Sequence, residues 1–451
     1  MMHLAEAARV LAASLTSGGG AEFTAVSTDS RTLPPGALFV ALRGERFDGH
    51  RFLGAARDAG AVGALVDSGY DGEVPMPVMV VGDTRRALAD LARHWRGRFS
   101  PALIAIAGSN GKTTTKDMLA AILRQDAGDA GVLATAGNLN TDIGVSLTLL
   151  RMRAAHRYAA IELGTNHRGE IALLAGIAQP TIAVVTNALR DHLEFLGSVA
   201  EMAEENADAL RALPDDGIAV MNADDPHAAL FRRTAGARRV VDFGLEATAR
   251  VGATATLMSL SSEVTLRMPA GEARTVLSIP GLHNVRNALA AAACAAAVGI
   301  APAAVAAGLA AFRPATRRLQ IKPLPDGATL LDDSYNANPD SVRAAIDVLA
   351  GCPAPTVLVL GDMGELGPDG AAFHREVGAY AHACGISRLV ALGEATRDSV
   401  QAFGNGGLHV AGVAEAAEAA RVGATILVKG SLFMGMDRVV AALTGETMEA
   451  H

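Results

Sequence analysis

The segment that most constrains the fold of this chain is residues 104–123, which read IAIAGSNGKTTTKDMLAAIL. An apolar run leads into a glycine-containing turn and a lysine, and behind them apolar residues recur at helical spacing from Met118 to Leu123. In such a strand–turn–helix unit, the N–H groups of the turn and the positive end of the helix dipole point to one spot, which favours an anion. The pattern therefore predicts a cradle for nucleotide phosphates. Its expected members are Gly108, Ser109, Asn110, Gly111, Lys112, Thr113 and Thr114.

Two side chains of this cradle carry groups that can bind a phosphate or its metal ion. Lys112 supplies a point charge, and the Thr113 hydroxyl stands where such loops hold a phosphate-bound magnesium ion. The general phosphate-loop pattern has a further glycine at the position of Ile106, and here only Gly108 and Gly111 are present. The alternative interpretation is a tight strand-to-helix turn followed by a solvent-exposed lysine.

The length of 451 residues predicts about three domains of roughly 150 residues each. We expect a mixed α/β unit over residues 1–98, which ends in the helical pattern TRRALADLARHWRGRF. Residues 99–313 hold the phosphate cradle and short apolar strands separated by helices, which is typical of a largely parallel, doubly wound sheet. Near 250–280 the pattern alternates, as in antiparallel strands. Residues 314–451 form a second α/β unit without a phosphate loop of its own.

Composition excludes several classes of protein. The net charge of −8 and the lack of an extended basic run argue against a nucleic-acid-binding protein. The first residues, MMHLAEAARVLAASL, lack the basic start of an export signal and predict an amphipathic helix. Cys294, Cys352 and Cys384 have no metal-binding spacing, so we expect core residues in a reducing compartment, the cytoplasm.

One uncharged segment, residues 288–312, is long enough to span a bilayer. It consists mostly of alanine, however, and Gly299 and Pro302 are a natural helix end and a natural first residue of the next helix. We therefore expect two packed helices and no insertion into a membrane.

Polar residues follow the strands of the central segment. Glu162, Asn187, and Asp191 with His192 stand where parallel strands end, at the edge that faces the ligand crevice beside the phosphate cradle. Glu162 is a candidate magnesium ligand, and the alternative is a helix cap. His192 is a candidate site residue, and the alternative is an ordinary loop histidine.

Six motifs together resemble the Mur ligases of peptidoglycan synthesis. They are AGSNGKTTT (107–115), IELG (161–164), DHLE (191–194), GLHNVRNALAA (281–291), TRRLQ (316–320) and DDSYNANPDS (332–341). Three more, GNLNTDIGVSLTLL (137–150), ELGTNHRGEI (162–171) and VLGDMGELG (359–367), are most similar to the branch of the family that takes a dipeptide. No DNPR-type stretch of the diaminopimelate-adding branch is present.

The resemblance implies three domains: an N-terminal UDP-binding domain, a central ATPase domain and a C-terminal Rossmann-like domain. It implies ATP-dependent addition of D-alanyl-D-alanine to a UDP-N-acetylmuramoyl-tripeptide through an acyl phosphate, in a cytoplasmic monomer. The catalytic residues would be Lys112, Glu162 and His192. Thr113 and Glu162 would hold one magnesium ion, and His192 with Glu162 would help to hold a second.

Further residues are carried over from the family motifs. The candidates for ATP are Asn284, Arg318 and Asp333, with Tyr335 and Asn336 nearby in the nucleotide pocket. The candidates for the muramoyl-peptide are Asn138, Asn140 and Thr141. The candidates for the UDP end are Ser30 and Arg31, with Arg43 and His50 as further candidates. Helix capping is the alternative for Asn284, and solvent-facing turns are the alternative for the N-terminal residues.

Three positions depart from the family pattern. Ser146 stands where relatives often have proline, at an expected helix start, and Leu432 stands where a basic residue is usual. Asn206 occupies the position where many Mur ligases have a carbamylated lysine that helps to hold the second magnesium ion. We expect that site to be weaker here. Two other functions match parts of the pattern: folylpolyglutamate synthesis, whose enzymes share the shortened loop without DDSYNANP or GNLNTDIG, and a regulatory nucleotide-binding protein without catalysis.

Overall fold

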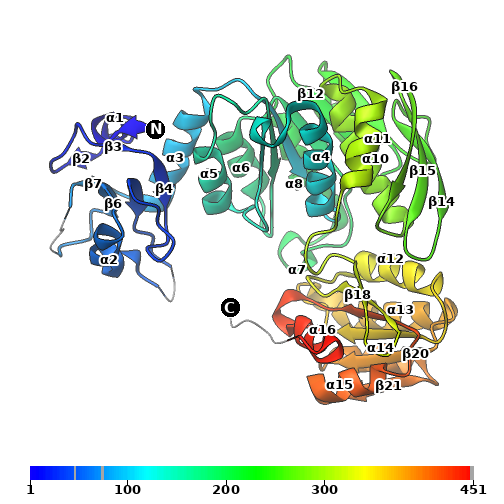
Figure 1. The fold of residues 1–451 in the computed structure, drawn as a ribbon. Helices are drawn as coiled ribbons and strands as arrows, with labels where there is room; N and C mark the ends of the chain where they lie inside the picture. The colour runs from blue at the N-terminus through cyan, green and yellow to red at the C-terminus, as the bar shows by residue number, and fades with distance from the viewer. Residues whose placement is uncertain (45–46, 73–75, 447–451) are drawn as a thin grey trace.

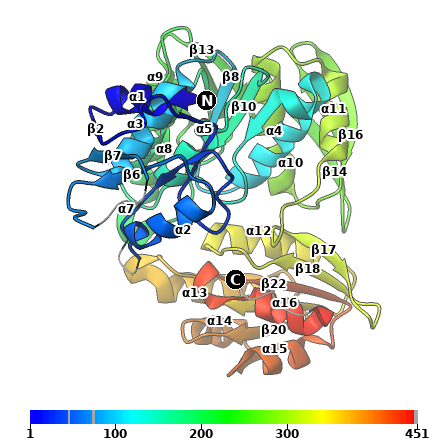
Figure 2. The same ribbon diagram turned by 60° about the vertical axis from the view of Figure 1, so that its left-hand side comes forward.

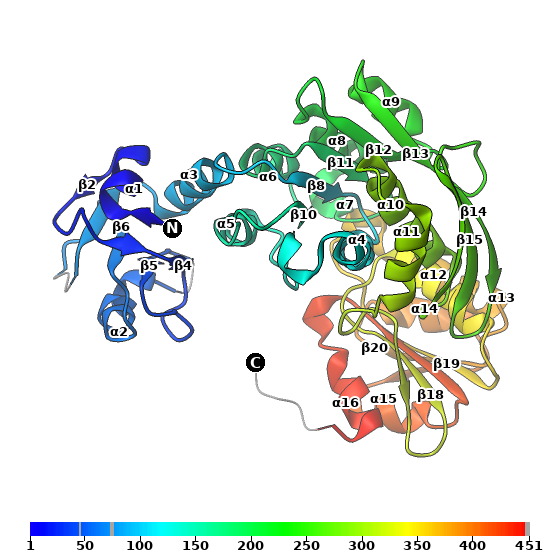
Figure 3. The ribbon, with the colours of Figure 1, turned by 45° about the horizontal axis from the view of Figure 1, so that its top comes forward.

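The chain folds into three α/β domains that follow one another along the sequence (Figure 1). The structure, a computed structural model, describes residues 1–44, 47–72 and 76–446. The N-terminal domain stands apart and meets the central domain at one end, whereas the C-terminal domain lies against the opposite side of the central domain (Figures 1 and 3). The expected three-domain α/β architecture is thereby confirmed.

The N-terminal domain is built on a five-stranded sheet in the order β2-β7-β6-β5-β4, with β2 antiparallel to β7 and the other pairs parallel. A separate antiparallel pair joins β1 and β3. The strands are β1 (Met2–His3), β2 (Ser14–Leu15), β3 (Glu22–Phe23), β4 (Ala25–Ser27), β5 (Ala37–Val40), β6 (Gly63–Asp67) and β7 (Val78–Val81). The helices are α1 (Leu4–Val10), the 3₁₀ turn η1 (Gly49–Phe52), α2 (Leu53–Asp58) and α3 (Thr84–Arg96).

The central domain contains a six-stranded, fully parallel sheet in the order β13-β12-β11-β8-β10-β9. Its strands are β8 (Ala102–Ala107), β9 (Val132–Ala134), β10 (Tyr158–Glu162), β11 (Ile182–Val185), β12 (Ile218–Asn222) and β13 (Arg239–Phe243). Its helices are α4 (Lys112–Ala127), η2 (Asp129–Gly131), α5 (Asp142–Leu150), α6 (Glu170–Ala178), α7 (Leu193–Leu196), α8 (Val199–Arg211), α9 (Ala228–Ala235), α10 (Leu282–Ala297) and α11 (Pro302–Ala311). The first strand, β8, lies in the middle, so the chain winds outward from it in both directions.

Successive residues of β8 point to opposite faces of this sheet and enter two different cores. Ile104 and Ile106 pack with α4, α10 and α11. Leu103 and Ala105 pack with α5, α6 and α8 on the other face. Both faces are therefore covered by helices, which explains why the strand reads as an unbroken apolar run.

Helix α3 connects the first two domains through this second core. Leu88, Leu91 and Trp95 are buried there together with Val145 and Leu149 of α5. The indole Nε1 of Trp95 also donates a hydrogen bond to the carbonyl of Met152 at 3.0 Å. The helix thus belongs by sequence to the N-terminal segment and by packing to both domains.

The uncharged stretch at 288–312 forms the two helices that the sequence predicts, α10 and α11, which pack against α4. Among the described residues, no helix is long and apolar enough to cross a membrane. The alternating stretch near 250–280 forms an antiparallel sheet of β14 (Gly252–Leu257), β15 (Ser262–Met268) and β16 (Gly271–Leu277), also as expected.

The C-terminal domain has a six-stranded sheet in the order β17-β18-β22-β19-β20-β21, parallel except for β17 (Figure 2). Its strands are β17 (Gln320–Pro323), β18 (Thr329–Asp333), β19 (Thr356–Gly361), β20 (Arg388–Leu392), β21 (Gly407–Val410) and β22 (Thr425–Lys429). Its helices are α12 (Pro339–Ala350), η3 (Gly367–Asp369), α13 (Gly370–Ala383), α14 (Thr396–Phe403), α15 (Val413–Ala420), η4 (Leu432–Met434) and α16 (Asp437–Thr444).

Two details differ from expectation. Cys294 is buried in α10 as predicted, but Cys352 and Cys384 are only partly buried, because they follow or end helices α12 and α13 at the domain surface. Ser146 does not start a helix: α5 begins at Asp142 and is capped by the Thr141 side chain, so Ser146 lies one turn inside and is fully buried.

Candidate active site

The phosphate cradle is the turn between β8 and α4, and its two glycines adopt conformations that few other residues tolerate. Gly108 has φ +137° and Gly111 has φ +80°. A Cβ atom at Gly108 would lie 2.0 Å from Oγ1 of Thr186, and one at Gly111 would lie 2.1 Å from Oδ1 of Asn287. A side chain is therefore excluded at both positions. Gly111 is also the N-cap of α4 and has no side chain with which to cap the helix, which suits an anion site.

The turn is held by the end of the neighbouring strand β11. The N–H groups of Ser109 and Asn110 donate to the backbone carbonyl and side-chain oxygen of Asn187, at 3.1 and 2.9 Å. The hydroxyl of Thr186 and the amide of Asn187 donate in return to the carbonyl of Asn110, at 2.9 and 3.0 Å. The strand-end residue Asn187 thus fixes the shape of the cradle.

Lys112 folds back over the cradle. Its ammonium group donates to the carbonyls of Gly108 and Ser109, at 2.5 and 2.9 Å. Burial lowers the pKa of Lys112; the carboxylates of Asp191 and Glu162 act in the opposite direction, and Arg318 lowers the pKa further. The lysine therefore stands among two acidic groups and a second cation.

Glu162 ends strand β10 and faces the first turn of α4. Its Oε1 accepts hydrogen bonds from the Thr113 hydroxyl at 3.1 Å and from the Asn140 amide at 2.9 Å. Its Oε2 is buried and has no hydrogen-bond partner. An unpartnered carboxylate oxygen beside a threonine hydroxyl matches the hard oxygen ligands that Mg²⁺ requires. The residues present therefore fit a magnesium ion.

The loop before α5 contributes the three expected peptide-binding residues in different ways. Asn140 reaches Glu162 with its side chain, as described. Thr141 accepts a hydrogen bond from the N–H of Gly144 at 3.4 Å as the cap of α5, and Asn138 is exposed. The structure therefore brings one of the three into contact with the site.

His192 lies in the loop after β11 with a left-handed backbone, φ +50°. Its Nδ1 contacts the carboxylate of Glu365 from the C-terminal domain, and its Nε2 lies 3.5 Å from Oδ2 of Asp191. Within the described part of the chain, no three His, Cys, Asp or Glu side chains gather into a metal-binding group. The structure thus joins Glu162 to Thr113, and His192 to Asp191 and Glu365.

The C-terminal domain brings Arg318 to the cradle. Its guanidinium stacks on the ring of Tyr335 at 3.9 Å and donates to the Thr113 hydroxyl at 3.5 Å. Asp333 pairs with Lys429 at 2.6 Å, and Lys429 also donates to the carbonyl of Asn336 at 2.9 Å. The four expected residues of this domain, Arg318, Asp333, Tyr335 and Asn336, therefore lie in two small clusters at one face of the domain.

Asn284 is 2% exposed at the start of α10. Its amide donates to the carbonyl of Pro280 at 2.7 Å and lies 2.9 Å from Nε2 of His283, while its oxygen accepts from Asn287 at 3.1 Å. Burial lowers the pKa of His283 to about 4; the nearby charge of Asp333 raises this pKa, and that of Lys429 lowers it. The start of α10 therefore faces the Asp333 cluster of the C-terminal domain.

The N-terminal candidates form no common group. Arg31 is highly exposed and pairs with Asp29 at 2.7 Å, which holds the pKa of Asp29 at about 2. Ser30 beside it is half-buried. Arg43 and His50 instead meet at Asp48 and Asp67: Nδ1 of His50 lies 2.6 Å from Asp48, and Arg43 pairs with both carboxylates.

Sequence analysis missed Asn338, Arg190, Glu365 and His283. Asn338 was only part of the DDSYNANP motif, yet its side chain exchanges hydrogen bonds with Asn110 of the cradle, at 2.8 and 3.2 Å. Glu365 stands in the motif GDMGELG, to which the sequence alone assigns no role. The signal for these residues was their membership of a recognised motif; Arg190 had no local signal.

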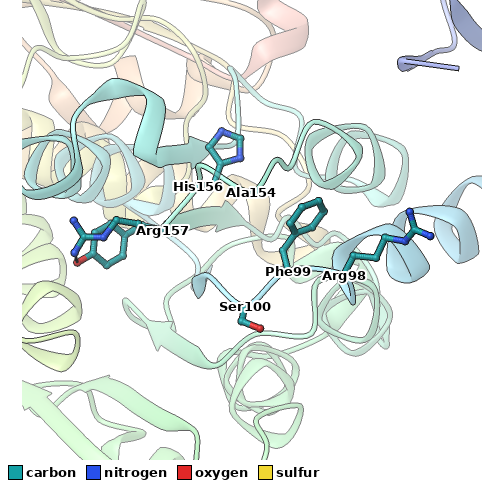
Figure 4. Close-up of a pocket in the computed structure, with 7 residues that line it drawn as sticks. Arg98, Phe99, Ser100, Ala154, His156 and Arg157 are labelled. Atoms are coloured by element: carbon teal, nitrogen blue, oxygen red, sulfur yellow. Dashed lines mark hydrogen bonds between the residues drawn. The ribbon is translucent and has the colours of Figure 1, made fainter. Parts of the chain in front are cut away.

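A separate hollow of about 560 Å³ opens at the amino ends of β8 and β10 in the central sheet (Figure 4). It is lined by Arg98, Phe99, Ser100, Ala154, His156, Arg157 and Tyr158. Its cations already have partners: Arg157 pairs with Asp126 at 3.1 Å, and Arg98 pairs with Glu6. Because the cradle lies at the carboxyl ends of the strands, this hollow is not part of the site described above.

Three family profiles match the chain. "Mur ligase family, catalytic domain" covers residues 22–96, "Mur ligase middle domain" covers 106–295, and "Mur ligase, glutamate ligase domain" covers 317–432.

The chain is also similar to curated proteins named UDP-N-acetylmuramoyl-tripeptide–D-alanyl-D-alanine ligase. It is 43% identical over 434 residues to that of Escherichia coli strain K12, covering 94% of this chain and 95% of the relative. It is 36% identical to that of Bacillus subtilis, covering 82% and 80%.

Two solved structures have similar folds. One is a crystal structure of MurF from Acinetobacter baumannii, with a TM-score of 0.90, 32% identity and 98% coverage of both chains. The other is MurF ligase from Thermotoga maritima in complex with ADP, with a TM-score of 0.83, 25% identity and coverage of 94% of this chain and 97% of that one.

Proposed function

Since the chain belongs to the Mur ligase family, we propose that it joins D-alanyl-D-alanine to a UDP-N-acetylmuramoyl-tripeptide in a reaction driven by ATP. The observation that carries this proposal is the meeting of Lys112, Thr113, Glu162 and Arg318 at the cradle. These groups come from the central and C-terminal domains and surround one point with two cations, a hydroxyl and an unpartnered carboxylate oxygen.

The reaction requires two steps on the terminal carboxylate of the tripeptide. The carboxylate attacks the γ-phosphate of ATP, which gives an acyl phosphate and ADP. The amine of D-alanyl-D-alanine then attacks the acyl carbon, and phosphate leaves as the amide forms. The protein contributes mainly position and charge to a phosphoryl transfer of this kind.

The residues have distinct parts in these steps. Lys112 and the turn amides bind the phosphate oxygens whose charge grows as the γ-phosphate is transferred. Arg318 supplies a second cation from the C-terminal domain, and Asn284 and Asp333 would contact the nucleoside. Asn140, beside Glu162, would meet the carboxylate end of the tripeptide, with Asn138 and Thr141 on the same loop. Ser30 and Arg31 would contact the UDP end.

Mg²⁺ is part of the proposal. Thr113 and Glu162 would hold one ion, because a buried carboxylate oxygen without a partner stands beside the Thr113 hydroxyl. When bound, the ion neutralises charge on the phosphate oxygens. His192, together with Glu162, would help to hold a second, weaker ion; Asp191 lies 3.5 Å from its Nε2.

We place the domain boundaries near residues 98/99 and 313/314, which lie between the matched family segments. We further propose that the protein is a cytoplasmic monomer. Size-exclusion chromatography with light scattering would reveal a mass near 46.1 kDa for a monomer.

The test of the function is release of phosphate from ATP. We expect release to require both UDP-N-acetylmuramoyl-tripeptide and D-alanyl-D-alanine, and to match the amount of pentapeptide product formed. Tripeptides that end in lysine or diaminopimelate are assayed separately to identify the third residue. Phosphate release that is independent of the dipeptide, or product formation with glutamate and a folate instead, would contradict the proposal.

A further inference from the structure

Successive residues of the loop between β11 and α7 contact the C-terminal domain, namely Arg190, Asp191 and His192. Arg190 begins the series. Its backbone N–H donates to Oδ2 of Asp340 at 2.9 Å, and its guanidinium bonds to Oδ1 of Asp340 at 2.6 and 3.1 Å. The same guanidinium makes two bonds to Glu376, at 2.7 and 3.0 Å, and lies 5.1 Å from the ring of Phe373. A planar fork of donors is required to bridge two carboxylates in this way.

The next residue, Asp191, is joined to the C-terminal domain by Asn338. Asp191 is 7% exposed, and its Oδ1 accepts from the Asn338 amide at 3.0 Å. The same amide nitrogen donates to Oδ1 of Asn110 in the phosphate cradle, at 2.8 Å. Asn338 is also the N-cap of α12, so its position is fixed by the helix that carries Asp340. The cradle, Asp191 and α12 therefore form one connected unit.

His192 completes the series through its contact with Glu365. Both residues have left-handed backbones, φ +50° for His192 and +59° for Glu365, although neither is glycine. The N–H of Glu194 also donates to the carbonyl of Glu365, at 3.1 Å. Such conformations persist where surrounding contacts fix them, and they concentrate at functional sites.

We propose that Glu365 is a positioning residue for His192. We further propose that Arg190 holds the loop of His192 against the domain that carries Glu365. A carboxylate has only acceptors, so the Nδ1 of His192 that contacts Glu365 donates to it. Asp191 faces Nε2 on the other side of the ring, so the ring lies between two carboxylates, one from each domain. A carboxylate that orients a metal-binding histidine in this way is a general device, and here that carboxylate belongs to the other domain. Docking of the C-terminal domain thus sets the direction of the His192 ring.

This inference rests on the proposed function only for the role of His192 toward magnesium. The surroundings of the His192 ring can be measured without substrate. The proposed function and the inference can therefore fail separately. A parent enzyme that does not ligate the dipeptide contradicts the proposed function. Unaltered ring signals of His192 after removal of the Glu365 carboxylate contradict the inference.

The first experiment replaces the carboxylate. Glu365→Gln keeps the length of the side chain and removes its charge. Glu365→Asn removes the contact while favouring the left-handed backbone, which separates the side-chain effect from backbone strain. The matched control is Glu394→Gln, in which an exposed glutamate of the same domain, paired only with Arg397, loses its charge.

For both Glu365 variants we expect kcat to fall by about 10- to 100-fold, the range typical for loss of a partner that orients a metal ligand. KM for ATP should stay within twofold, and the magnesium concentration for half-maximal rate should rise. In ¹H–¹⁵N spectra of the substrate-free protein, with His192 assigned from a His192→Gln variant, the ring nitrogen signals of His192 should shift from their positions in the parent spectrum. A His192 signal and a kcat that match those of Glu394→Gln overturn the proposal.

The second experiment tests the part of Arg190. Arg190→Lys keeps the charge but cannot make paired bonds to two carboxylates. Arg190→Ala removes both the charge and the bonds. Arg397→Ala is the control for loss of a surface arginine. We expect faster amide hydrogen exchange in residues 190–196 and a fall in kcat for Arg190→Ala, with at most partial rescue by lysine. Unchanged exchange in that segment, with parental kcat, would show that Arg190 does not hold it.

Discussion

Arg318 of the C-terminal domain donates a hydrogen bond to the hydroxyl of Thr113 in the first turn of α4, at 3.5 Å. The same guanidinium is stacked on Tyr335, so its direction is fixed from its own domain. The contact therefore joins the phosphate cradle of one domain to a rigid cation of another. The geometry of the site thus depends on how the two domains are placed.

Replacement of Arg318 by lysine should weaken ATP binding. Lysine keeps the charge but loses the planar stack on Tyr335 and the fixed direction of the donors. We expect KM for ATP to rise about tenfold, equivalent to about 1.4 kcal/mol. Arg313→Lys is a suitable control, since Arg313 is exposed and bonds only to the carbonyls of Ala310 and Phe312. Equal KM values in the two variants would contradict a nucleotide contact by Arg318.

Replacement of Lys112 by alanine should nearly abolish ligation without unfolding the protein. Loss of one preorganised charge at a developing oxyanion lowers the rate by about 10²–10³, roughly 2.7–4 kcal/mol. Steady-state phosphate release is the measurement, with thermal unfolding as the check on folding. A folded variant within threefold of the parent rate would falsify the phosphate-cradle assignment.

Asn206 should make the enzyme independent of carbon dioxide. Its side chain is fully buried in α8, and neither amide atom has a hydrogen-bond partner. A neutral amide cannot be carbamylated and is a weaker partner for Mg²⁺ than a carboxylate. We expect the same rate in bicarbonate-free buffer and with added bicarbonate, whereas Asn206→Lys should respond to bicarbonate. A parent enzyme that gains strongly from bicarbonate would place the charged lysine elsewhere.

The same side chain allows a prediction about stability. A buried amide without partners opposes folding, because the unfolded chain solvates it. Asn206→Leu, whose side chain has the same number and branching of heavy atoms but no polar atom, should therefore raise the free energy of unfolding by about 1 kcal/mol. Urea unfolding of parent and variant in the absence of magnesium is the measurement, and destabilisation by a similar amount would show that the amide has partners in solution.

His283 should lower stability in mild acid. Burial holds its pKa at about 4 in the folded protein, against 6.5 for an ordinary histidine. Between these values the unfolded chain binds a proton that the folded protein does not, so stability is full above pH 6.5 and falls as the pH drops toward 4. Urea midpoints at pH 7.5 and 5.0 should differ less in His283→Gln than in the parent. Identical differences would exclude His283 as a cause.

The features that could be predicted from sequence are those determined by neighbouring residues. The apolar run of β8, the glycines of the turn and the helical spacing behind Lys112 are local, and so is the break at Gly299 and Pro302 between α10 and α11. Thr141 shows the limit of that reasoning, because a resemblance assigned it to substrate while its side chain caps α5. Its role toward substrate stays a prediction.

The contacts between domains could not be derived in this way. Arg190 and Asp340 are 150 positions apart, and Asn110 and Asn338 are 228 apart. No periodicity connects such pairs, since each depends on how two separately folded sheets are placed. The resemblance identified motifs on both sides, but the pairing of Glu365 with His192 required the three-dimensional arrangement.

Helix α3 limits how freely these domains can be recombined. Leu88, Leu91 and Trp95 lie in the same core as Val145 and Leu149 of α5, although the sequence boundary falls after the helix. A swap of N-terminal domains between relatives at that boundary would transplant one half of a matched interface and leave the other half behind. Inheritance of the N-terminal domain is thus linked to inheritance of the helices that cover the central sheet, so the two domains are expected to diverge together rather than as interchangeable modules.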